Sequence, residues 1–376
     1  MNFDFSEEQY LLRDQAREFL DDRSPPSVVH AVLEDESISY DKKLWREMAE
    51  LGWLGTTIPE EYGSAGLTGE DLCVIAEELG QTLAPTPFSS SVYMATEALL
   101  LAGSDAQKQE YLPAMAAGDR IGCMAVSESV GVANAASIKL SASDGTIEGT
   151  KVPVADGDVA DFAVVLARPA GGDGLSLFLV VLDDDSVSRK PVEMIDPTRS
   201  HARIFFEGTA AEPLGEAGEG WSILQAVFDR AAILMAFEQV GGAQACLDMA
   251  TGYARNRFAF GRPIGSFQAI KHKLAVIYIA TELARANAYY GAWALATDAP
   301  DLPTAAAAAR VAASEAYNLA ARENIQTHGG RGFTWEFDCH LFYRRAKLLS
   351  LALGGERRWK DWLIGHLEAR NSPREI

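Results

Sequence analysis

The sequence predicts an α+β protein in which a helical region is followed by a β-rich region and then by a second helical region. Apolar residues recur at helical spacing from residue 5 to about 118, and again over long stretches after residue 218. Between about 121 and 212 the pattern changes to short β-rich runs separated by turn sequences such as SDG and GGDG. The 376 residues, of which 48% are hydrophobic and 23% charged, suffice for two or three domains with buried cores.

The first region, predicted to be a helical domain over residues 1–119, shows apolar side chains three and four residues apart. Such spacing places them on one face of a helix. The chain starts with acids in an amphipathic pattern, where a secretory signal would have a basic and then an apolar segment. We therefore expect a cytoplasmic protein. The apolar positions include Tyr10, Leu11, Ala16 and Leu20, and later Leu72, Ile75, Ala76 and Leu79.

The middle region, over residues 120–216, is predicted to be a β domain. Its short runs are rich in β-branched and aromatic residues, which favour strands, and turn residues separate them. The runs are GCMAVSE, ASIKLSA, FAVVLAR, LSLFLVVL and ARIFFEG.

The last region, over residues 217–376, is predicted to form an antiparallel bundle of long helices. Helical spacing covers residues 221–254, 265–296, 304–329 and 335–369. The sequences FGRPIG, TDAPDLP and HGGRG interrupt this spacing, because glycine and proline end helices.

Composition excludes several classes of partner. The 33 Lys and Arg residues against 53 Asp and Glu give a net charge of −20, which repels phosphate backbones and anionic lipid headgroups. We therefore expect no nucleic-acid partner. No continuous apolar run approaches the roughly 18 to 20 residues of a bilayer span, so no membrane association is expected. The four cysteines form no CxxC pair, which predicts buried thiols and no metal site.

Five stretches carry a resemblance to a known family. They are FSEEQYLLRDQAREFL and GTTIPEEYGSAGL near the start, IGCMAVSESVGVANAASIKL at 121–140, YARNRFAFGRPIGSFQAIKHKLA at 253–275 and IQTHGGRGFTWEFDCHLFYRRAK at 325–347. With these stretches in this order, the chain resembles the acyl-CoA dehydrogenase flavoproteins over essentially its whole length. The resemblance implies a middle antiparallel β-barrel-like domain, a C-terminal four-helix bundle, FAD as cofactor and an acyl-CoA thioester as substrate.

In that family FAD lies at a subunit interface, so its binding groups divide into a home half and a donated half. An Arg in the donated half suits a pyrophosphate because its planar fork offers charge-assisted donors, and glycines let the backbone approach closely. The structural alternative is a helix break with a surface Arg. By resemblance the donated half here consists of Arg257 and Phe260 in an RxxFG pattern, Phe267, Gln268, and then Gln326, Gly329 and Gly330 in QTHGG.

The home half departs from the family pattern. Ser127 keeps the hydroxyl that faces the flavin, but Val132 and Ala133 replace a Gly-Ser pair that would meet the pyrophosphate. The family segment K-x-W-I-T, whose Trp packs beside the isoalloxazine, reads KVPVA at 151–155. The aromatic wall and its neighbouring hydroxyl are both missing.

The catalytic base is also missing from the two places where the family keeps it. Removal of the α-proton while the β-hydride moves to flavin needs a carboxylate. Gapless counting after RRAK places Leu353 at one such position, and Ala231 occupies the other, on the first helix of the C-terminal bundle. Glu356 and Glu238 are the nearest candidates. The alternative for Glu238 is a buried or interface carboxylate paired with an Arg.

Three further residues have structural interpretations. By resemblance, His328 within QTHGG is a loop spacer near the dinucleotide rather than a general base. Trp335 and Glu336 resemble the family's anchor for the helix that follows.

Three functions remain open from the sequence. The first is a self-sufficient homo-oligomeric acyl-CoA dehydrogenase with a displaced base. The second is a subunit that completes the FAD site of a paralogous partner subunit in a hetero-oligomer, where the partner supplies the Glu. The third is a scaffold with the same fold, against which the intact donated half argues. For the first two, the resemblance implies an electron-transfer flavoprotein as acceptor, and lipid or steroid catabolism as context.

Overall fold

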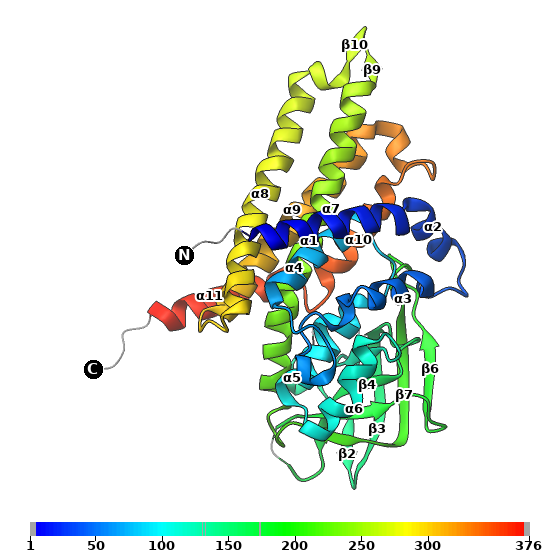
Figure 1. Cartoon of the computed structure of the whole chain (residues 1–376), viewed down its shortest axis with the longest axis vertical. Helices are drawn as coiled ribbons and strands as arrows, with labels where there is room; N and C mark the ends of the chain where they lie inside the picture. Colours follow the sequence, from blue (N-terminus) through cyan, green and yellow to red (C-terminus); the bar gives the residue numbers. More distant parts are fainter. Residues whose placement is uncertain (1–4, 130, 132, 173, 372–376) are drawn as a thin grey trace. The chain divides into compact units, whose positions relative to one another are not determined.

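The computed structural model describes residues 5–129, 131, 133–172 and 174–371 (Figure 1). By its internal contacts the chain divides into two compact units. The first unit is made of Met1–Val29, Gly69–Ala84 and Ala232–Ile376, and the second of His30–Thr68 and Pro85–Ala231. The division into three domains with boundaries at 119/120 and 216/217 stays a prediction.

The second unit contains a sheet of eight strands in the order β6-β7-β3-β2-β4-β5-β8, with β1 beside β4. Both β1 and β2 run parallel to β4, and the other neighbouring strands pair antiparallel. The strands are β1 (Gly122–Ala125), β2 (Ser141–Ser143), β3 (Thr146–Ala155), β4 (Phe162–Pro169), β5 (Ser176–Val181), β6 (Val187–Pro191), β7 (His201–Ala210) and β8 (Glu212–Leu214).

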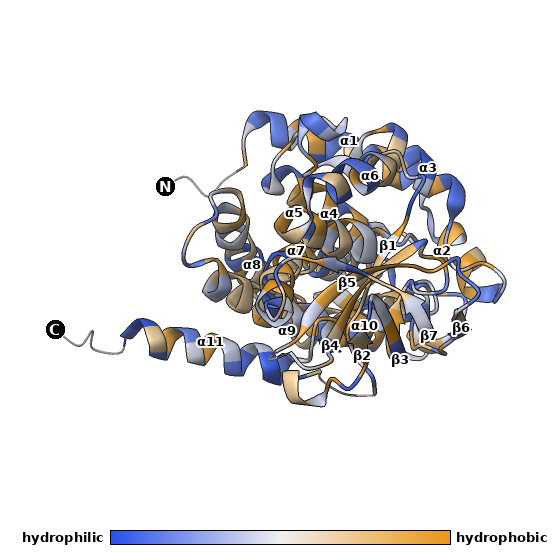
Figure 2. Cartoon of the chain, turned by 90° about the horizontal axis from the view of Figure 1, so that it is seen from below, coloured by the Kyte–Doolittle hydropathy of each residue, from blue (hydrophilic) through white to orange (hydrophobic). Residues whose placement is uncertain are grey.

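The expectation of an antiparallel, barrel-like domain needs correction in two respects. The sheet ends at β6 and β8, so within the described residues it is open. It is also mixed, because the chain returns after β2 and β3 to form β4, which runs parallel to β1. Strand β4 is buried from Phe162 to Ala167, as expected for a strand covered on both faces. Figure 2 shows β4 and β5 coloured as hydrophobic segments of the sheet.

Short helices complete the second unit. The side chain of Asp41 caps one of them by accepting a hydrogen bond from the Leu44 N–H at 2.7 Å. The π-helix η3 (Ser89–Thr96) is buried over all eight of its residues, and such helices are uncommon outside functional sites. The α-helices are α3 (Lys42–Glu50), α5 (Glu97–Ala102) and α6 (Asp105–Ala116), and the 3-10 turns are η1 (Trp53–Gly55), η2 (Glu60–Tyr62) and η4 (Ala135–Ser137). Helix α2 (Pro26–Glu34) spans the division between the units.

The first unit is helical. Helix α7 (Gly220–Asn256) enters it at Ala232, α8 runs back beside α7 after a hairpin, and α9 packs on α8, α10 and α11 (Figure 1). The described C-terminal part contains the five helices α7 to α11, so a four-helix bundle stays a prediction. The elements are α1 (Glu7–Arg23), α4 (Gly69–Thr82), β9 (Phe258–Ala259), β10 (Arg262–Pro263), η5 (Ile264–Ser266), α8 (Gln268–Ala296), α9 (Leu302–His328), η6 (Gly329–Phe333), α10 (Cys339–Leu351) and α11 (Glu356–Asn371).

Helices α4 and α7 cross with their backbones in close approach. A Cβ atom at Gly80 would lie 1.9 Å from the carbonyl oxygen of Glu238, and one at Gly241 would lie 1.9 Å from that of Glu77. Only glycine fits at either position. The crossing brings Glu238 against the end of α4.

Helix α7 is the one described helix that is long and apolar enough, by composition, to cross a bilayer. Its most apolar window is 67% buried inside the molecule, which is typical of a core helix. The four cysteines are buried free thiols, as expected.

Candidate functional site

The RxxFG sequence forms a hairpin that projects from the end of α7. Strands β9 and β10 pair Ala259 with Arg262, and the two residues between them, Phe260 and Gly261, have φ angles of 50° and 78°. Positive φ at both central residues is required by a type I′ turn. A bulky residue rarely adopts this conformation, and the Phe260 side chain is 96% exposed. The turn thus holds the ring of Phe260 exposed to solvent.

Arg257 lies where α7 ends and the hairpin begins. Its backbone N–H donates to the Tyr253 carbonyl at 2.8 Å, and its own carbonyl accepts from the Ile264 N–H at 2.7 Å. These two bonds fix the base of the hairpin. The Arg257 side chain is exposed, so its guanidinium can meet an external anion.

Phe267 and Gln268 mark the start of α8 on the other side of the hairpin. The ring of Phe267 lies 6.2 Å from that of Phe260, between centroids, and the Arg262 guanidinium sits 4.0 Å from the Phe267 ring. No side chain caps this helix end. Gln268 is exposed, and the first backbone N–H groups of an uncapped helix suit an anion.

The QTHGG residues end α9. Gln326 is exposed in the last helical turn, and Gly329 and Gly330 are exposed in the turn that follows. Gly329 has a φ of 61°, which favours glycine. Gly330 has no such angle, and a Cβ atom added to it would meet nothing within 4 Å. No contact with the described residues explains Gly330, whereas close approach of an external group would.

A ring cluster, formed by Tyr253, His328 and Phe337, joins these segments. The centroid of the His328 ring lies 4.2 Å from that of Tyr253 and 5.8 Å from that of Phe337. His328 is 6% exposed, so the imidazole packs inside the unit. The predicted donated residues on the hairpin and on η6 therefore lie at the same end of the first unit, where α7 and α9 finish.

This end of the first unit is electropositive. In a chain with a net charge of −20, no Asp or Glu occurs between Asp248 and Glu282. Lys273 is paired with Glu323 at 2.7 Å, which leaves most of the positive charge on the hairpin and its flanks. Exposed aromatics beside guanidinium groups suit a ligand that is both anionic and aromatic. The cations of this acid-free segment are Arg255, Arg257, Arg262, Lys271 and Lys273.

The predicted home half lies in the second unit. Ser127 follows β1, is half-buried, and accepts a hydrogen bond on its carbonyl from the Val152 N–H at 2.8 Å. Ala133 is half-buried, and Val132 lies outside the described residues. Pro153, in a cis peptide bond with Val152, stands where the family has its Trp. The home half thus presents a hydroxyl but no aromatic wall among its described residues.

A buried lysine, which sequence reasoning did not assign, holds this segment. The Lys151 Nζ atom is buried and donates to the Val126 carbonyl and to Glu128 Oε1, both at 2.9 Å. Burial lowers the pKa of Lys151 to about 8, although Glu128 opposes the shift. Burial alone raises the pKa of Glu128, but hydrogen bonds from the Leu140 N–H and Lys151 bring it below its ordinary value. In the sequence, the only signal for Lys151 was its place at the start of KVPVA, where the family has K-x-W-I-T.

The two family positions for the base hold apolar side chains. Ala231 is fully buried. Leu353 lies in the turn between α10 and α11 with a φ of 59°. The turn is held by Arg310, which is buried and donates to the carbonyls of Leu349 and Ala352.

The two candidate carboxylates are both engaged. Glu238 is 0% exposed, and its Oε1 atom accepts from Arg345 at 3.3 Å, which is the pairing that the structural alternative describes. Arg345 is 1% exposed and also donates to the Leu83 carbonyl. Glu356 begins α11 and forms an ion pair with Lys360. Their catalytic assignment stays a prediction.

Another buried carboxylate, Glu97, was not foreseen. Burial raises the pKa of Glu97 to about 7, and Arg230 partly opposes this shift. Glu97 is the only charged residue between Val92 and Leu101. A single acid in an apolar run was the available signal.

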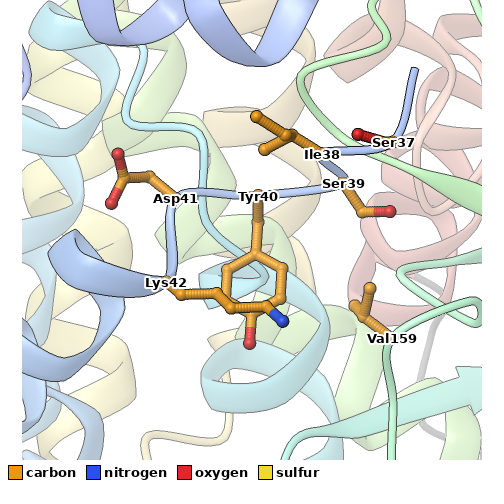
Figure 3. A pocket seen from close by; sticks show the side chains of 7 residues that line it. All are labelled: Ser37, Ile38, Ser39, Tyr40, Asp41, Lys42 and Val159. Atoms are coloured by element: carbon orange, nitrogen blue, oxygen red, sulfur yellow. The ribbon is translucent and has the colours of Figure 1, made fainter. Parts of the chain in front are cut away.

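Two cavities of the second unit have linings that include none of these residues. One, of about 470 Å³, is lined by the loop from Ser37 to Lys42 together with Val159 (Figure 3). The other, of about 440 Å³, is lined by Lys42, Lys43, Arg46, Glu47 and Glu50.

Comparison with known proteins identifies the family of the chain. Residues 6–119 match the family model of the acyl-CoA dehydrogenase N-terminal domain, and residues 218–357 match that of the C-terminal domain. The chain is 36% identical over 342 residues to the acyl-CoA dehydrogenase IpdE2 of Mycobacterium tuberculosis, covering 90% of this chain and 91% of the relative.

Solved structures show the same fold over nearly the full length. The ChsE4-ChsE5 complex from Mycobacterium tuberculosis is 27% identical with a TM-score of 0.87, covering 100% of both chains. A variant of the Tcur3481-Tcur3483 steroid ACAD is 30% identical with a TM-score of 0.87, covering 98% of this chain and 99% of that one. The chain therefore belongs to the acyl-CoA dehydrogenase family, whose members are generally FAD-dependent oxidoreductases.

Proposed function

We propose that this chain is a subunit of an FAD-dependent acyl-CoA dehydrogenase and that it completes the FAD site of a paralogous partner subunit. The observation that carries the proposal is the contrast between the two halves of the site. The surface with Arg257, Phe260 and Gly330 keeps the residues of the family pattern and is exposed, and the segment between Asp248 and Glu282 has no acid, whereas the described home half lacks its aromatic wall.

The exposed surface fits a flavin dinucleotide. The Arg257 guanidinium and the uncapped start of α8 would hold the diphosphate, and Gly330 would let it come close to the backbone. Phe260 offers a ring face for stacking. When bound, FAD would accept the β-hydride of an acyl-CoA thioester, and these residues would bind and orient it.

The base positions support a partner that supplies the carboxylate. The side chains of Leu353 and Ala231 cannot take a proton, Glu238 is tied to Arg345, and Glu356 is tied to Lys360. Two of the similar solved structures are named for a pair of proteins, ChsE4-ChsE5 and Tcur3481-Tcur3483. A hetero-oligomer with a paralogue follows naturally from both observations.

Helix α8 supplies a surface for assembly. Val276, Ile279 and Leu283 recur at helical spacing on one face and are 54%, 55% and 61% exposed. Apolar rows of this kind mark protein interfaces. The C-terminal helices are thus the proposed subunit contact.

The alternative of a self-sufficient homo-oligomer uses the same surface but needs Glu356 or Glu238 to leave its present ion pair. The scaffold alternative gives the acid-free segment and Gly330 no role. On the family resemblance, the proposed electron acceptor is an electron-transfer flavoprotein. The proposed cytoplasmic location rests on the acidic, amphipathic start of the sequence.

The decisive experiment is to express the chain alone and together with a paralogue that is encoded next to it in the genome, and to measure bound FAD and acyl-CoA oxidation. We expect activity only in the mixture, and its loss when the partner's Glu is replaced by Gln. The activity of the chain alone should be lower by at least about 10²–10⁴-fold, the contribution of general acid-base catalysis. Ordinary turnover by the isolated chain would reject the two-subunit proposal.

A binding variant tests the surface directly. Arg257→Ala should weaken flavin retention in the mixture by about 1.5 to 3 kcal/mol, the range for a hydrogen bond to a charged group. Arg203→Ala, at an exposed Arg on β7, is the charge-matched control and should leave retention unchanged. Equal flavin content in both variants would contradict the assignment of Arg257.

A further inference from the structure

The ring cluster sits between the two segments of the proposed flavin surface, and nothing in the proposed function assigns it a role. Tyr253 lies in the last turn of α7, four residues before Arg257. His328 is the last residue of α9 and directly precedes Gly329. We propose that His328 is a positioning residue that fixes the spacing between Arg257 and the Gln326–Gly330 segment, so that both reach one diphosphate. The inference rests on the proposed function.

The orientation of the imidazole is set within α9. Its Nδ1 atom lies 2.9 Å from the Asn324 carbonyl oxygen, one turn earlier, so a proton on Nδ1 makes this hydrogen bond. The ring plane then lies at 31° to that of Tyr253, with 4.2 Å between centroids. A stacked ring restrains both translation and tilt of one helix end against the other.

A second contact one turn earlier fixes the same register. Asn324 is fully buried, and its Nδ2 atom donates to the Met249 sulfur at 3.7 Å. Met249 and Tyr253 are four residues apart on α7, as Asn324 and His328 are on α9, so the two pairs form consecutive rungs between the helices. The pair of His328 and Tyr253 is the outer of the two rungs, and it lies next to Gly329 and Gly330.

Gly329 and Gly330 lie between this pair of rings and Gly332, which packs against Ile325 of α9. Gly329 has a φ of 61° and no neighbour within 4 Å of where a Cβ would stand, and Gly330 is equally open. On the other helix, the Arg257 N–H donates to the Tyr253 carbonyl. The His328–Tyr253 stack is therefore the nearest fixed point common to both ligand-binding segments, and a shift there moves one relative to the other.

The test uses the complex with the partner subunit. His328→Phe keeps a flat ring and loses the Nδ1 hydrogen bond, whereas His328→Ala loses both. We expect His328→Ala to weaken FAD retention by roughly tenfold, as loss of a supporting residue commonly does, and His328→Phe to stay within about twofold of the unmodified complex. His366→Ala on α11 is the matched control and should change nothing.

Coupling to Arg257 separates positioning from general stability. If His328 acts through the placement of Arg257, the double variant His328→Ala/Arg257→Ala should hold FAD no more weakly than Arg257→Ala alone. In the flavin-free complex, His328→Ala should also speed amide exchange at 257–264 and 326–333 while leaving the middle of α8 unchanged. If His328→Ala does not fold, His328→Gln, which keeps the size and loses the ring, takes its place.

Each outcome decides something. Unchanged flavin retention in His328→Ala, or additive losses in the double variant, would overturn the inference. If Arg257→Ala retains FAD normally, the assignment of Arg257 in the proposed function fails, and the exchange result then still shows whether His328 ties the two segments together.

Discussion

Glu238, Arg345 and Arg310 are charged side chains that are 0% to 1% exposed inside the first unit. Burial lowers the pKa of Arg310 to about 10, and Glu238 opposes the shift. Arg310 also meets the carbonyl end of α10, where the helix dipole favours a cation. Taking one partner away leaves the other charge buried and poorly solvated, which is costlier than losing the pair itself.

At this scale we predict that Glu238→Ala lowers the free energy of unfolding by about 3 to 5 kcal/mol, the range for breaking a buried pair. Urea unfolding of Glu238→Ala, compared with that of the unmodified chain, measures this loss of stability. Glu356→Ala is the control, because its ion pair with Lys360 is exposed to solvent and should contribute no more than about 1 kcal/mol. Similar losses in both variants would contradict the assignment of Glu238 as a structural carboxylate.

Glu97 predicts a pH dependence with a definite sign. Burial raises its pKa in the folded protein to about 7, above the ordinary 4.5, so folding favours the protonated carboxyl. The stability that this group contributes is fully present below pH 4.5 and is lost as the pH rises to 7. Glu97→Gln should therefore be more stable than the unmodified chain at pH 8, by about 1 to 3 kcal/mol, and nearly equal to it at pH 4.5.

The measurement is urea unfolding at both pH values. Because the same variant is compared with the unmodified chain, titration of Asp156, whose pKa burial raises to about 6, cancels from the difference. A difference that does not change with pH would show that Glu97 stays charged in the folded protein.

Among the elements, the crossing of α4 and α7 depends on two glycines. Gly80→Ala or Gly241→Ala gains helix propensity but places a methyl group 1.9 Å from a backbone oxygen. The helices must separate, so we expect a net loss of about 1 to 3 kcal/mol, typical of overpacking. Gly365→Ala in α11, where a Cβ meets nothing within 4 Å, should instead gain about 0.5 to 1 kcal/mol. Thermal unfolding distinguishes the three variants, and a gain at Gly80 would refute the close crossing.

At the scale of the whole molecule, the row on α8 predicts assembly. Ile279→Lys puts a charge in the middle of the proposed contact and should weaken association with the partner by at least about tenfold, since a buried unpaired charge is costly. Leu11→Lys, at a 62% exposed position on α1, is the control. Sedimentation of the mixed subunits reports both, and unchanged association of the Ile279 variant would place the interface elsewhere.

The order of helical and β regions could be predicted because apolar periodicity is a local property of the chain. The pairing of β1 with β4 could not be predicted. Gly122 pairs with Phe162 although two strands lie between them in the sequence, and no local pattern encodes that choice. In the site, short motifs marked Arg257 and Gly330. The Lys151–Glu128 and His328–Tyr253 contacts join residues far apart in sequence, so only the folded chain reveals them.

The hairpin and the apolar row on α8 also affect how much of this protein a cell can hold in soluble form. Phe258 and Phe260 at the hairpin, 61% and 96% exposed, and the α8 row together form adhesive surface whenever no partner covers it. A chain made in excess of its partner would carry that surface unprotected and be prone to aggregate or to be degraded. In the proposed hetero-oligomer, matched synthesis of the two subunits would keep this surface covered, which favours genes that are transcribed and translated side by side.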